Sequence, residues 1–393
     1  MTSRLFDEED LVDAARAETG LDDFGPDHFR EGMGVLIDSL TNDAQLKDEV
    51  VPRARALFTG RLTMRLRIQE WLNDHPEVLN ERVEAPICIL GSPRSGSSIM
   101  HELWSLDPAT RNPLAWEVRS PIPPPETATY LTDPRIAALQ AQMGGPPEAA
   151  AEGTRAVPHR SGAMLPSEDV EITMLDFASV IPMVTFYVPT YTKWLFDEVD
   201  YGPVYAYLTT FLQLLQSRCP GSPWVLKSLY SMHYMDAFLA AYPDARVIWL
   251  HRDPLTATAS GVNLVQMAAS GSSDRVDRVD LARDVAHWSV VRHDLSVDVQ
   301  EKGMLPSAQL FNVRYPEFVR DHVGMVKRIY EHFDIELRPE VEQTMRDYVA
   351  AHPAEELGGR HEYSLEQSGL DSREYRERFR RYQQYFDIPD DAG

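Results

Sequence analysis

The sequence is poor in cationic side chains and almost devoid of lysine. Its 38 lysines and arginines face 61 aspartates and glutamates, which gives a formal net charge of −23, and only five of the 393 residues are lysine. This surplus of negative charge disfavours binding to nucleic acid, to anionic membranes and to heavily sulfated polysaccharides. We therefore expect no nucleic-acid partner for this chain.

Cysteines, long apolar runs and metal-ligand motifs are also missing. The two cysteines cannot build a disulfide framework. No run of roughly 18 uncharged apolar residues could span a membrane, and the acidic N-terminus lacks the basic and apolar regions of a signal peptide. No His-x-x-x-His or Cys-x-x-Cys pair occurs, so we expect no metal site. These absences predict a cytoplasmic protein without a membrane span, and they leave its oligomeric state open.

The apolar pattern divides the chain into three parts. Helical spacing dominates before residue 84, short apolar runs of strand length occur between residues 85 and 338, and helical spacing returns after residue 339. We predict an α/β core at 85–338, a helical N-terminal extension at 1–84 packed on it, and a helical C-terminal extension at 339–393. The last expected helix, Arg373–Arg381, is so charged that we expect its face to be solvated.

The most informative segment runs from Pro86 to His101. Ile87–Leu90 is a short apolar run that predicts a buried strand; it stops at Gly91, and apolar residues at helical spacing begin at Ile99. A strand, a tight glycine-containing loop and a helix start aim several backbone N–H groups at one point, at the positive end of the helix dipole. The segment predicts an anion site, to which three hydroxyls add donors: Ser95, Ser97 and Ser98.

The same loop nearly matches the phosphate loop of nucleotide-hydrolysing enzymes. Gly91 and Gly96 are separated by four residues, as in that motif, but Ser97 stands where its lysine belongs, and the nearest cation is Arg94. We therefore do not expect the bound anion to be the β/γ-phosphate of ATP. The alternative is a capped helix start without a ligand.

A second strand, Val247–Leu250, also leads into a helix. Arg252 lies just beyond the apolar run, Pro254 suits the first turn of a helix, and Ser260 lies two turns into that helix. The planar fork of an arginine at a strand end can bind a phosphate. The alternative is an ordinary surface ion pair between Arg252 and Asp253. A third apolar run, Trp224–Lys227, also ends in a cation.

Together these segments resemble the sulfotransferases that use 3′-phosphoadenylyl sulfate (PAPS), in particular a bacterial branch. The loop Pro93–Ser98 is similar to their 5′-phosphosulfate loop, usually Pro-(Lys/Arg)-Ser-Gly-Thr-Thr, and Arg252 and Ser260 match their 3′-phosphate grip in type and spacing. Lys227 resembles the family's lysine at a strand end. The segment 310–319 and the tail 358–371 are similar to further motifs, so the resemblance covers nearly the whole chain.

The resemblance implies a fold, a donor and a reaction. The fold is α/β, a mostly parallel central sheet with helices on both faces and the ligand at the carboxyl ends of the strands. A sulfuryl group passes from PAPS to a hydroxyl or amine of a small-molecule, lipid or glycan acceptor. Arg94 and Lys227 are expected beside the transferred group. The donor contacts implied are Arg94, Ser95, Gly96, Ser97, Ser98, Arg252, Ser260 and Tyr315.

The residue that takes the proton of the acceptor departs from the family pattern. Where the branch commonly has Lys-Ser-Pro-x-His, the chain reads Lys227-Ser-Leu-Tyr-Ser231, without the histidine. Our first candidate is Glu168, whose segment resembles the Pro-Glu-Glu motif of the branch. The alternative is that Glu168 only complements the dipole of a helix capped by Ser167. His101 is the second candidate and Glu117 the third.

Two other functions remain open at this point. A magnesium-dependent kinase or NTPase would need an acid such as Asp253 to hold the metal, and the missing loop lysine argues against it. A non-catalytic nucleotide-binding scaffold of the same fold would account for the missing histidine. The acceptor is not named by any motif. The aromatic, methionine-rich stretches Met174–Tyr191 and Tyr201–Phe211 either line an apolar acceptor pocket or pack in the core.

Overall fold

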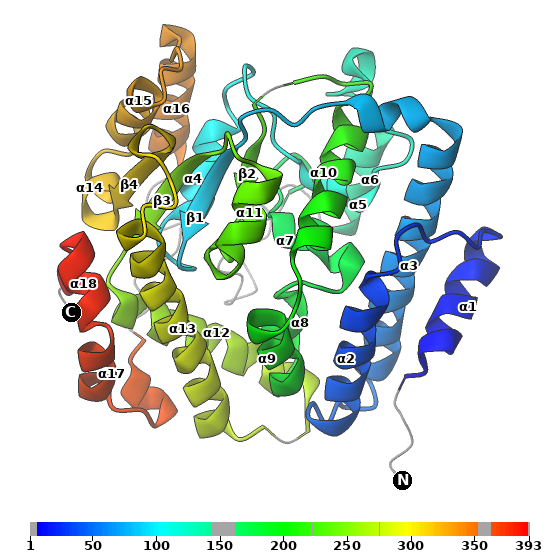
Figure 1. Cartoon of the computed structure of the whole chain (residues 1–393), viewed down its shortest axis with the longest axis horizontal. Helices are drawn as coiled ribbons and strands as arrows, with labels where there is room; N and C mark the ends of the chain where they lie inside the picture. The colour runs from blue at the N-terminus through cyan, green and yellow to red at the C-terminus, as the bar shows by residue number, and fades with distance from the viewer. Residues whose placement is uncertain (1–5, 144–161, 222, 275, 353–362, 392–393) are drawn as a thin grey trace.

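Four parallel strands form a central sheet in the computed structural model, which describes residues 6–143, 162–221, 223–274, 276–352 and 363–391. The strands β1 (Ile87–Gly91), β2 (Val225–Lys227), β3 (Arg246–His251) and β4 (Leu310–Arg314) lie in the order β2-β1-β3-β4 (Figure 1). The expected strands are confirmed, and so is the α/β class with a parallel sheet. Residues 358–362 of the C-terminal motif lie outside the described residues.

Helices make up most of the remaining described chain. The α-helices are α1 (Glu8–Thr19), α2 (Phe29–Asn42), α3 (Val51–Asp74), α4 (Ser97–Trp104), α5 (Ala115–Arg119), α6 (Pro134–Gln142), α7 (Asp169–Thr173), α8 (Ile181–Thr185), α9 (Pro189–Asp197), α10 (Gly202–Gln216), α11 (Met235–Ala241), α12 (Pro254–Ser272), α13 (Arg278–Glu301), α14 (Tyr315–Arg320), α15 (His322–His332), α16 (Pro339–Ala351), α17 (Ser372–Arg378) and α18 (Arg380–Phe386). Short 3₁₀ helices are η1 (Pro76–Asn80), η2 (Thr127–Thr129), η4 (Met174–Asp176), η5 (Ser231–Tyr234), η6 (Ser307–Gln309) and η7 (Leu365–Ser368). In the described part of the chain, no helix combines the length and the apolar character needed to cross a membrane.

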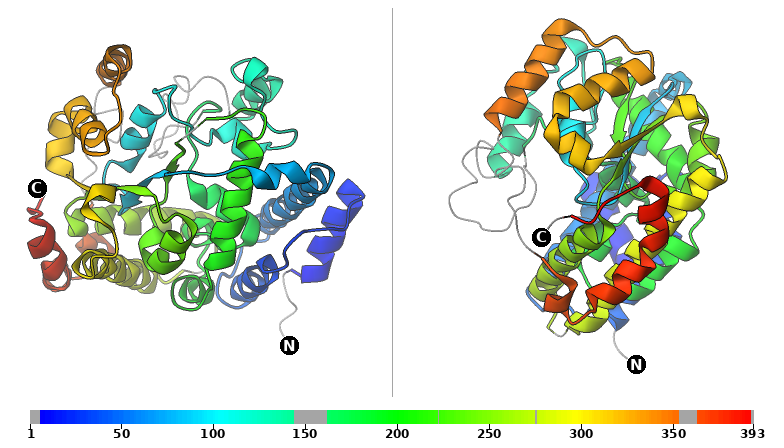
Figure 2. Two further views of the ribbon diagram at one scale, coloured as in Figure 1. Left: turned by 45° about the horizontal axis from the view of Figure 1, so that its top comes forward. Right: turned by 90° about the vertical axis from the view of Figure 1, so that its left-hand side faces the viewer.

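Alternate side chains of each strand enter two different hydrophobic clusters. In β1, Ile87 and Ile89 pack with α4, α15 and α16, whereas Cys88 and Leu90 pack with α10, α11 and the N-terminal helices. This follows from the two-residue period of a strand. Because helices cover both faces of the sheet, the inner strands β1 and β3 carry buried apolar side chains on both sides, whereas the edge strand β4 has Asn312 and Arg314 exposed. Figure 2 shows the sheet between these two layers of helices.

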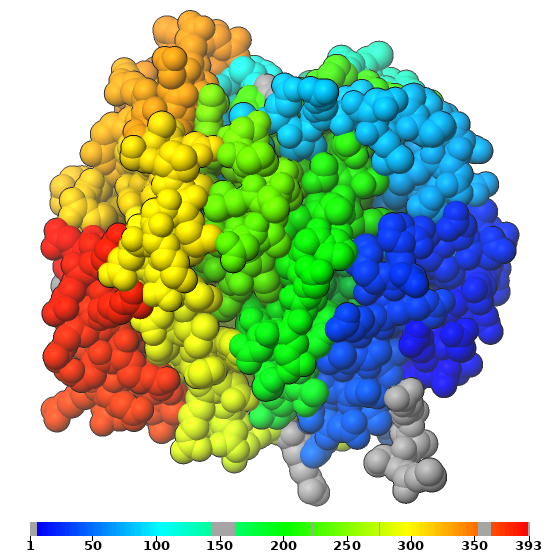
Figure 3. All heavy atoms as spheres, in the orientation of Figure 1, coloured from blue at the N-terminus to red at the C-terminus, as the bar shows by residue number. Residues whose placement is uncertain are grey.

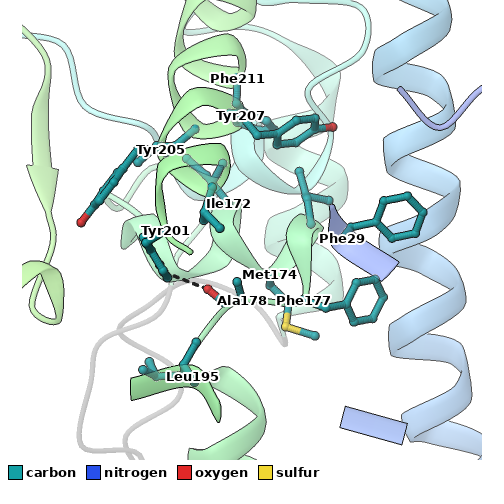
Figure 4. Packing of buried hydrophobic residues seen from close by; sticks show 14 of the residues in the cluster. Phe29, Ile172, Met174, Phe177, Ala178, Leu195, Tyr201, Tyr205, Tyr207 and Phe211 are labelled. Carbon is teal, nitrogen blue, oxygen red and sulfur yellow. Dashed lines mark hydrogen bonds between the residues drawn. The ribbon is translucent and has the colours of Figure 1, made fainter. Parts of the chain in front are cut away.

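The N-terminal helices α1–α3 share the second cluster with the sheet. Phe29 of α2 packs beside Phe177, and the rings of Tyr207 and Phe211 lie close by on α10 (Figure 4). The N-terminal and C-terminal helices form opposite flanks of the molecule, blue and red in Figure 3. The division into an extension at 1–84 and a core at 85–338 stays a prediction.

The C-terminal segment differs from expectation. Instead of one charged helix over Arg373–Arg381, the chain forms α17 and α18, which meet at Phe379. Phe379 is 1 % exposed and packs, with Tyr375, against apolar residues of α12 and α13. The helix breaks because burying this aromatic ring outweighs continuing a straight charged surface helix. One charged residue of this segment, Arg376, is also drawn inward by the buried Asp253.

Candidate active site

The strand order brings three cationic segments to one edge of the sheet. The chain runs from β1 to β2 on one side of β1 and then returns to β3 on its other side. Gly91 pairs with Leu250, Ile89 with Lys227 and His251 with Arg314. The carboxyl ends of the strands therefore meet where the strand order reverses, which is the position where open α/β sheets bind ligands.

The loop between β1 and α4 depends on two glycines. Gly91 has φ 138° and Gly96 has φ 90°, a region that L side chains rarely adopt. A Cβ on Gly91 would lie 2.5 Å from the carbonyl oxygen of Leu250, and one on Gly96 would lie 3.1 Å from the ring of Phe318. Gly96 is also the residue directly before α4, so the first N–H groups of that helix open onto the loop.

The hydroxyls of the loop do not all face a ligand. Ser95 is fully buried, and its Oγ donates to the carbonyl oxygen of Ser92 at 2.7 Å. Ser92 Oγ in turn lies 2.8 Å from Nε2 of His293, whose Nδ1 lies 2.6 Å from the carbonyl oxygen of Ser289. Since a carbonyl only accepts, Nδ1 carries the proton and Nε2 accepts from Ser92.

His293 is thus a neutral anchor that holds the loop from α13. Burial lowers its pKa to about 3, which keeps the imidazole uncharged. Nothing in the sequence around His293 marks this role, because the contact joins residues about 200 positions apart. Sequence reasoning missed it for that reason.

Lys227 joins the loop to the predicted base. Its Nζ donates to Ser98 Oγ at 3.0 Å and to Glu168 Oε1 at 2.7 Å. The lysine side chain is 4 % exposed and the glutamate 33 % exposed. A buried ammonium therefore sits beside the start of α4, with a partly open carboxylate next to it.

Arg252 connects the second cationic segment to the loop. Its Nη1 donates to the carbonyl oxygen of Arg94 at 2.8 Å, and its guanidinium lies 4.2 Å from the centre of the Tyr315 ring. A Cβ on Gly96 would lie 3.5 Å from that same ring. Tyr315 therefore touches both segments, and Ser260 follows on α12, partly buried.

Two arginines lie side by side here. Burial and the neighbouring Arg252 lower the pKa of Arg94. Such a concentration of positive charge in a protein of net charge −23 is a local pocket suited to an anion.

The surface ion pair that was the alternative for Arg252 and Asp253 is wrong. Arg252 Nε donates to Asp391 Oδ2 at 2.9 Å, in the C-terminal segment. Asp253 is 1 % exposed; it accepts from Arg376 Nη1 at 2.6 Å and from the backbone N–H groups of Leu255 and Asp391. Asp253 thus caps α12 and fastens the C-terminal segment to the site.

Glu168 stands one position earlier in its helix than expected. It precedes α7 in an extended conformation, with φ −78° and ψ 151°, and makes no side-chain cap, so Ser167 does not cap a helix that includes Glu168. The reason is that the Glu168 carboxylate turns to Lys227 instead of to the helix N–H groups. The next residue, Asp169, is buried, and burial raises its pKa to about 7.

The second and third candidate bases lie deeper in the protein. His101 is 1 % exposed, its Nε2 lies 3.3 Å from the carbonyl oxygen of Val225, and burial together with Lys227 lowers its pKa to about 3. Glu117 is fully buried; it forms an ion pair with Arg111 and accepts from the N–H of Leu114 at 2.9 Å. Both make contacts that hold the fold together.

Metal-ligating groups do not gather at this edge of the sheet. Among the residues that the structure describes, no group of three or more histidines, cysteines, aspartates or glutamates is placed to hold a metal ion. Both cysteines, Cys88 and Cys219, are free and buried.

Comparison with known proteins agrees with this geometry. The model of the sulfotransferase family matches residues 86–339. The structure is similar to sulfotransferase STF9 from Mycobacterium avium, with a TM-score of 0.88 and 33 % identity, covering 99 % of this chain and 98 % of that one. It is also similar to sulfotransferase STF1 from Mycobacterium tuberculosis, with a TM-score of 0.82 and 29 % identity, covering 96 % of this chain and 99 % of that one. No curated protein sequence matches. The chain belongs to the sulfotransferase family and is a sulfotransferase enzyme.

Proposed function

We propose that the enzyme transfers the sulfuryl group of PAPS to a hydroxyl or amine of a small-molecule, lipid or glycan acceptor. One observation carries the proposal: Arg94, Lys227 and Arg252, from the ends of three parallel strands, converge around a glycine-dependent loop. A donor with phosphates at both the 3′ and 5′ positions needs two separate cationic contacts. Sulfotransferases generally use PAPS as donor. The segments of Arg94 and Arg252 supply two such cationic contacts, one for each end of the donor.

The roles of the donor contacts follow from their positions. Arg252, covered by Tyr315, and Ser260 on α12 would hold the 3′-phosphate. The loop residues Arg94–Ser98, at the start of α4, would hold the 5′-phosphosulfate through backbone N–H groups and the Ser97 and Ser98 hydroxyls. Ser95 would contribute its backbone only, since its hydroxyl is bonded within the loop.

Lys227 and Glu168 divide the chemistry of the transfer. As the acceptor oxygen bonds to sulfur, the bond from sulfur to the 5′-phosphate oxygen breaks, and 3′,5′-ADP leaves with that electron pair. The Lys227 ammonium would neutralise the charge that grows on the leaving oxygen. Glu168 would take the acceptor proton, because its carboxylate is partly open and within 2.7 Å of Lys227.

The burial of the other candidates favours Glu168 as the base. His101 donates to a backbone carbonyl from inside the protein, and Glu117 is held by Arg111. Either residue would have to leave a buried contact before it could reach an acceptor. A cytoplasmic location is part of the proposal, supported by two free thiols in place of a disulfide.

The kinase or NTPase alternative is less well supported. The acid that it would need, Asp253, already accepts from Arg376 and from two backbone N–H groups. No contact of Asp253 argues against the scaffold alternative. Burying the charges of Lys227 and Glu168 costs hydration free energy, however, and a chain without a catalytic role would gain nothing in return.

Nucleotide binding tests the donor assignment. Calorimetric titration should show 3′,5′-ADP binding at least about tenfold tighter than 5′-AMP, because only the former reaches Arg252. A kinase or NTPase would instead bind ADP with Mg²⁺ more tightly than 3′,5′-ADP. That second pattern would overturn the proposal.

A further inference from the structure

A cavity of about 370 Å³ lies between α8, α9, α12 and α13. Its volume falls within the range of small-molecule pockets, roughly 300–1,000 Å³. Apolar side chains make up more than half of the residues that line it, and six of these apolar residues are buried: Met183, Phe186, Val188, Val265, Leu281 and Trp288. The stretch Met174–Tyr191 therefore contributes to this cavity, whereas Tyr207 and Phe211 of the second stretch pack in the core (Figure 4).

Two helices that line the large cavity also lead to a second, smaller cavity beside Asp169, the residue after the predicted base. A small cavity of about 10 Å³, beside the start of α7, is lined by Asp169, Val180 and Leu195. Met183 lies three residues after Val180, and Thr192 lies three residues before Leu195; both line the large cavity. Residues three apart share one face of a helix and lie about one turn, roughly 5 Å, apart along it.

A third helix makes the same connection. Arg292 of α13 places its guanidinium 4.7 Å from the ring of Tyr230, which lines the small cavity. Trp288, one turn earlier on α13, lines the large cavity. Three separate elements, α8, α9 and α13, therefore lead within about one turn from the small cavity, which Asp169 lines, to the large cavity.

The charges at the cavity are mainly negative. Asp284 and Asp197 line it, and the cation Lys193 is already engaged by Asp197 at 3.9 Å and by Glu198. The hydroxyl of Tyr187 donates to Asp284 at 3.4 Å, and burial raises the pKa of that carboxyl. An anionic ligand would meet carboxylates and apolar walls, which disfavours it.

We propose that this cavity binds the apolar body of the acceptor, and that the acceptor is a hydrophobic alcohol or phenol without negative charge. The proposal rests on the proposed function, because it places the acceptor hydroxyl toward Glu168. It narrows the acceptor class, since a glycan or an anionic lipid headgroup would bury polar or charged groups against Phe186, Leu281 and Trp288.

Matched acceptors test the class. With PAPS as donor, 2-naphthol should be sulfated with a kcat/KM at least about tenfold above that of 6-hydroxy-2-naphthoate, which adds one carboxylate, and above that of methyl glucoside. Equal values for the three acceptors, or a preference for the glucoside, would overturn the proposal.

Cavity-filling variants test the location. Val265→Phe should raise the KM for 2-naphthol at least about tenfold while the affinity for 3′,5′-ADP stays unchanged. Val285→Trp, at a half-buried position of the same wall, serves if Val265→Phe does not fold. The control is Met267→Trp, at a 47 % exposed position of the same helix α12, which should leave KM unchanged. Wild-type KM in both folded wall variants would overturn the proposal.

Removing a negative charge from the cavity wall should improve the use of an anionic acceptor. Asp284→Asn should raise kcat/KM for 6-hydroxy-2-naphthoate several-fold relative to 2-naphthol, whereas Asp280→Asn, on the exposed side of α13, should not. Binding of 2-naphthol, followed by calorimetry without PAPS, separates the two proposals. If naphthol binds in the cavity but no PAPS turnover occurs, the proposed function fails; if PAPS is used but the wall variants have no effect, only this inference fails.

Discussion

Two regions of the molecule differ in the groups that form them: the donor edge, which is the sheet edge with Arg94, Lys227 and Arg252, and the cavity between α8, α9, α12 and α13. At the donor edge, backbone groups and cations come from strand ends, and two glycines with φ of 138° and 90° fix their positions. At the cavity, four helices and the connection between α8 and α9 contribute mostly apolar side chains, and none of the lining residues has a positive φ. If the edge binds the donor and the cavity the acceptor, as we propose, substitutions at the glycine-dependent edge should impair donor binding, whereas substitutions of the side chains that line the cavity should change acceptor preference and leave donor binding intact.

Glu168 contacts Lys227 at the donor edge and directly precedes Asp169, which lines the small cavity; because Glu168 is the proposed base, its loss should have the largest effect. Glu168→Gln keeps the size of the side chain but removes its basicity, and kcat should fall on the order of 10²–10⁴-fold. Affinity for 3′,5′-ADP should barely move, because the donor edge is unchanged. Steady-state kinetics and calorimetry measure the two quantities.

His101→Asn is the paired control for the base. It should lower stability but leave turnover of the folded fraction intact, since His101 is buried behind Lys227. If instead His101→Asn abolished turnover while Glu168→Gln kept it, the role of base would pass to the histidine.

Lys227 is expected to act in the transition state more than in binding. Lys227→Met should reduce kcat about 10²–10³-fold and weaken 3′,5′-ADP binding much less. Arg94→Met should share this pattern. Lys302→Met, at an exposed position, is the control and should match the wild type. Unchanged kcat in Lys227→Met would mean that the lysine only supports the fold.

We expect Arg252 to act only in binding the 3′-phosphate of the donor. Arg252→Ala should weaken 3′,5′-ADP binding roughly 30- to 150-fold, as expected for the loss of a charge-assisted contact, and 5′-AMP binding far less. Arg314→Ala changes an exposed arginine at the end of the neighbouring strand and should leave both affinities alone. Equal losses for both nucleotides would remove Arg252 from the 3′-phosphate site.

The C-terminal segment adds a smaller effect at the same arginine. Asp391 puts a carboxylate on Arg252 Nε, next to the expected phosphate. Asp391→Asn should therefore tighten 3′,5′-ADP binding by about two- to fivefold, the scale of a partly exposed ion pair. Asp387→Asn, which changes the partner of Arg314, is the control. Weaker binding in Asp391→Asn would show that the carboxylate orients the arginine instead of competing with the phosphate.

That Arg94, Lys227 and Arg252 come together at one edge of the sheet could be predicted from the sequence, because each lies in a short local motif. Each of Arg94, Lys227 and Arg252 lies at the end of an apolar run or within four residues of it, so a short window shows both the strand and its cation. The fold class and the strands followed from the same windows. The predicted start of α7 was one residue too early. Glu168 lies just before the helix because its carboxylate contacts Lys227, 59 positions away in the sequence.

The other contacts could not be predicted because they join distant segments that carry no motif. His293 reaches Ser92 across 201 positions, and Asp391 reaches Arg252 across 139. The cavity depends on how α8, α9, α12 and α13 pack, and aromatic or methionine-rich stretches look alike in a core and in a pocket. The break at Phe379 likewise depends on the surface that α12 and α13 present to it.

Turnover without metal tests the central claim most directly. The purified enzyme is incubated with PAPS and 2-naphthol, or with other phenols, lipids and sugars, in the presence of EDTA, and 3′,5′-ADP and the sulfated product are quantified. We expect equal amounts of the two products and no stimulation by Mg²⁺. A strict requirement for Mg²⁺, or tight binding of 3′,5′-ADP with no sulfated product from any acceptor, would contradict the account.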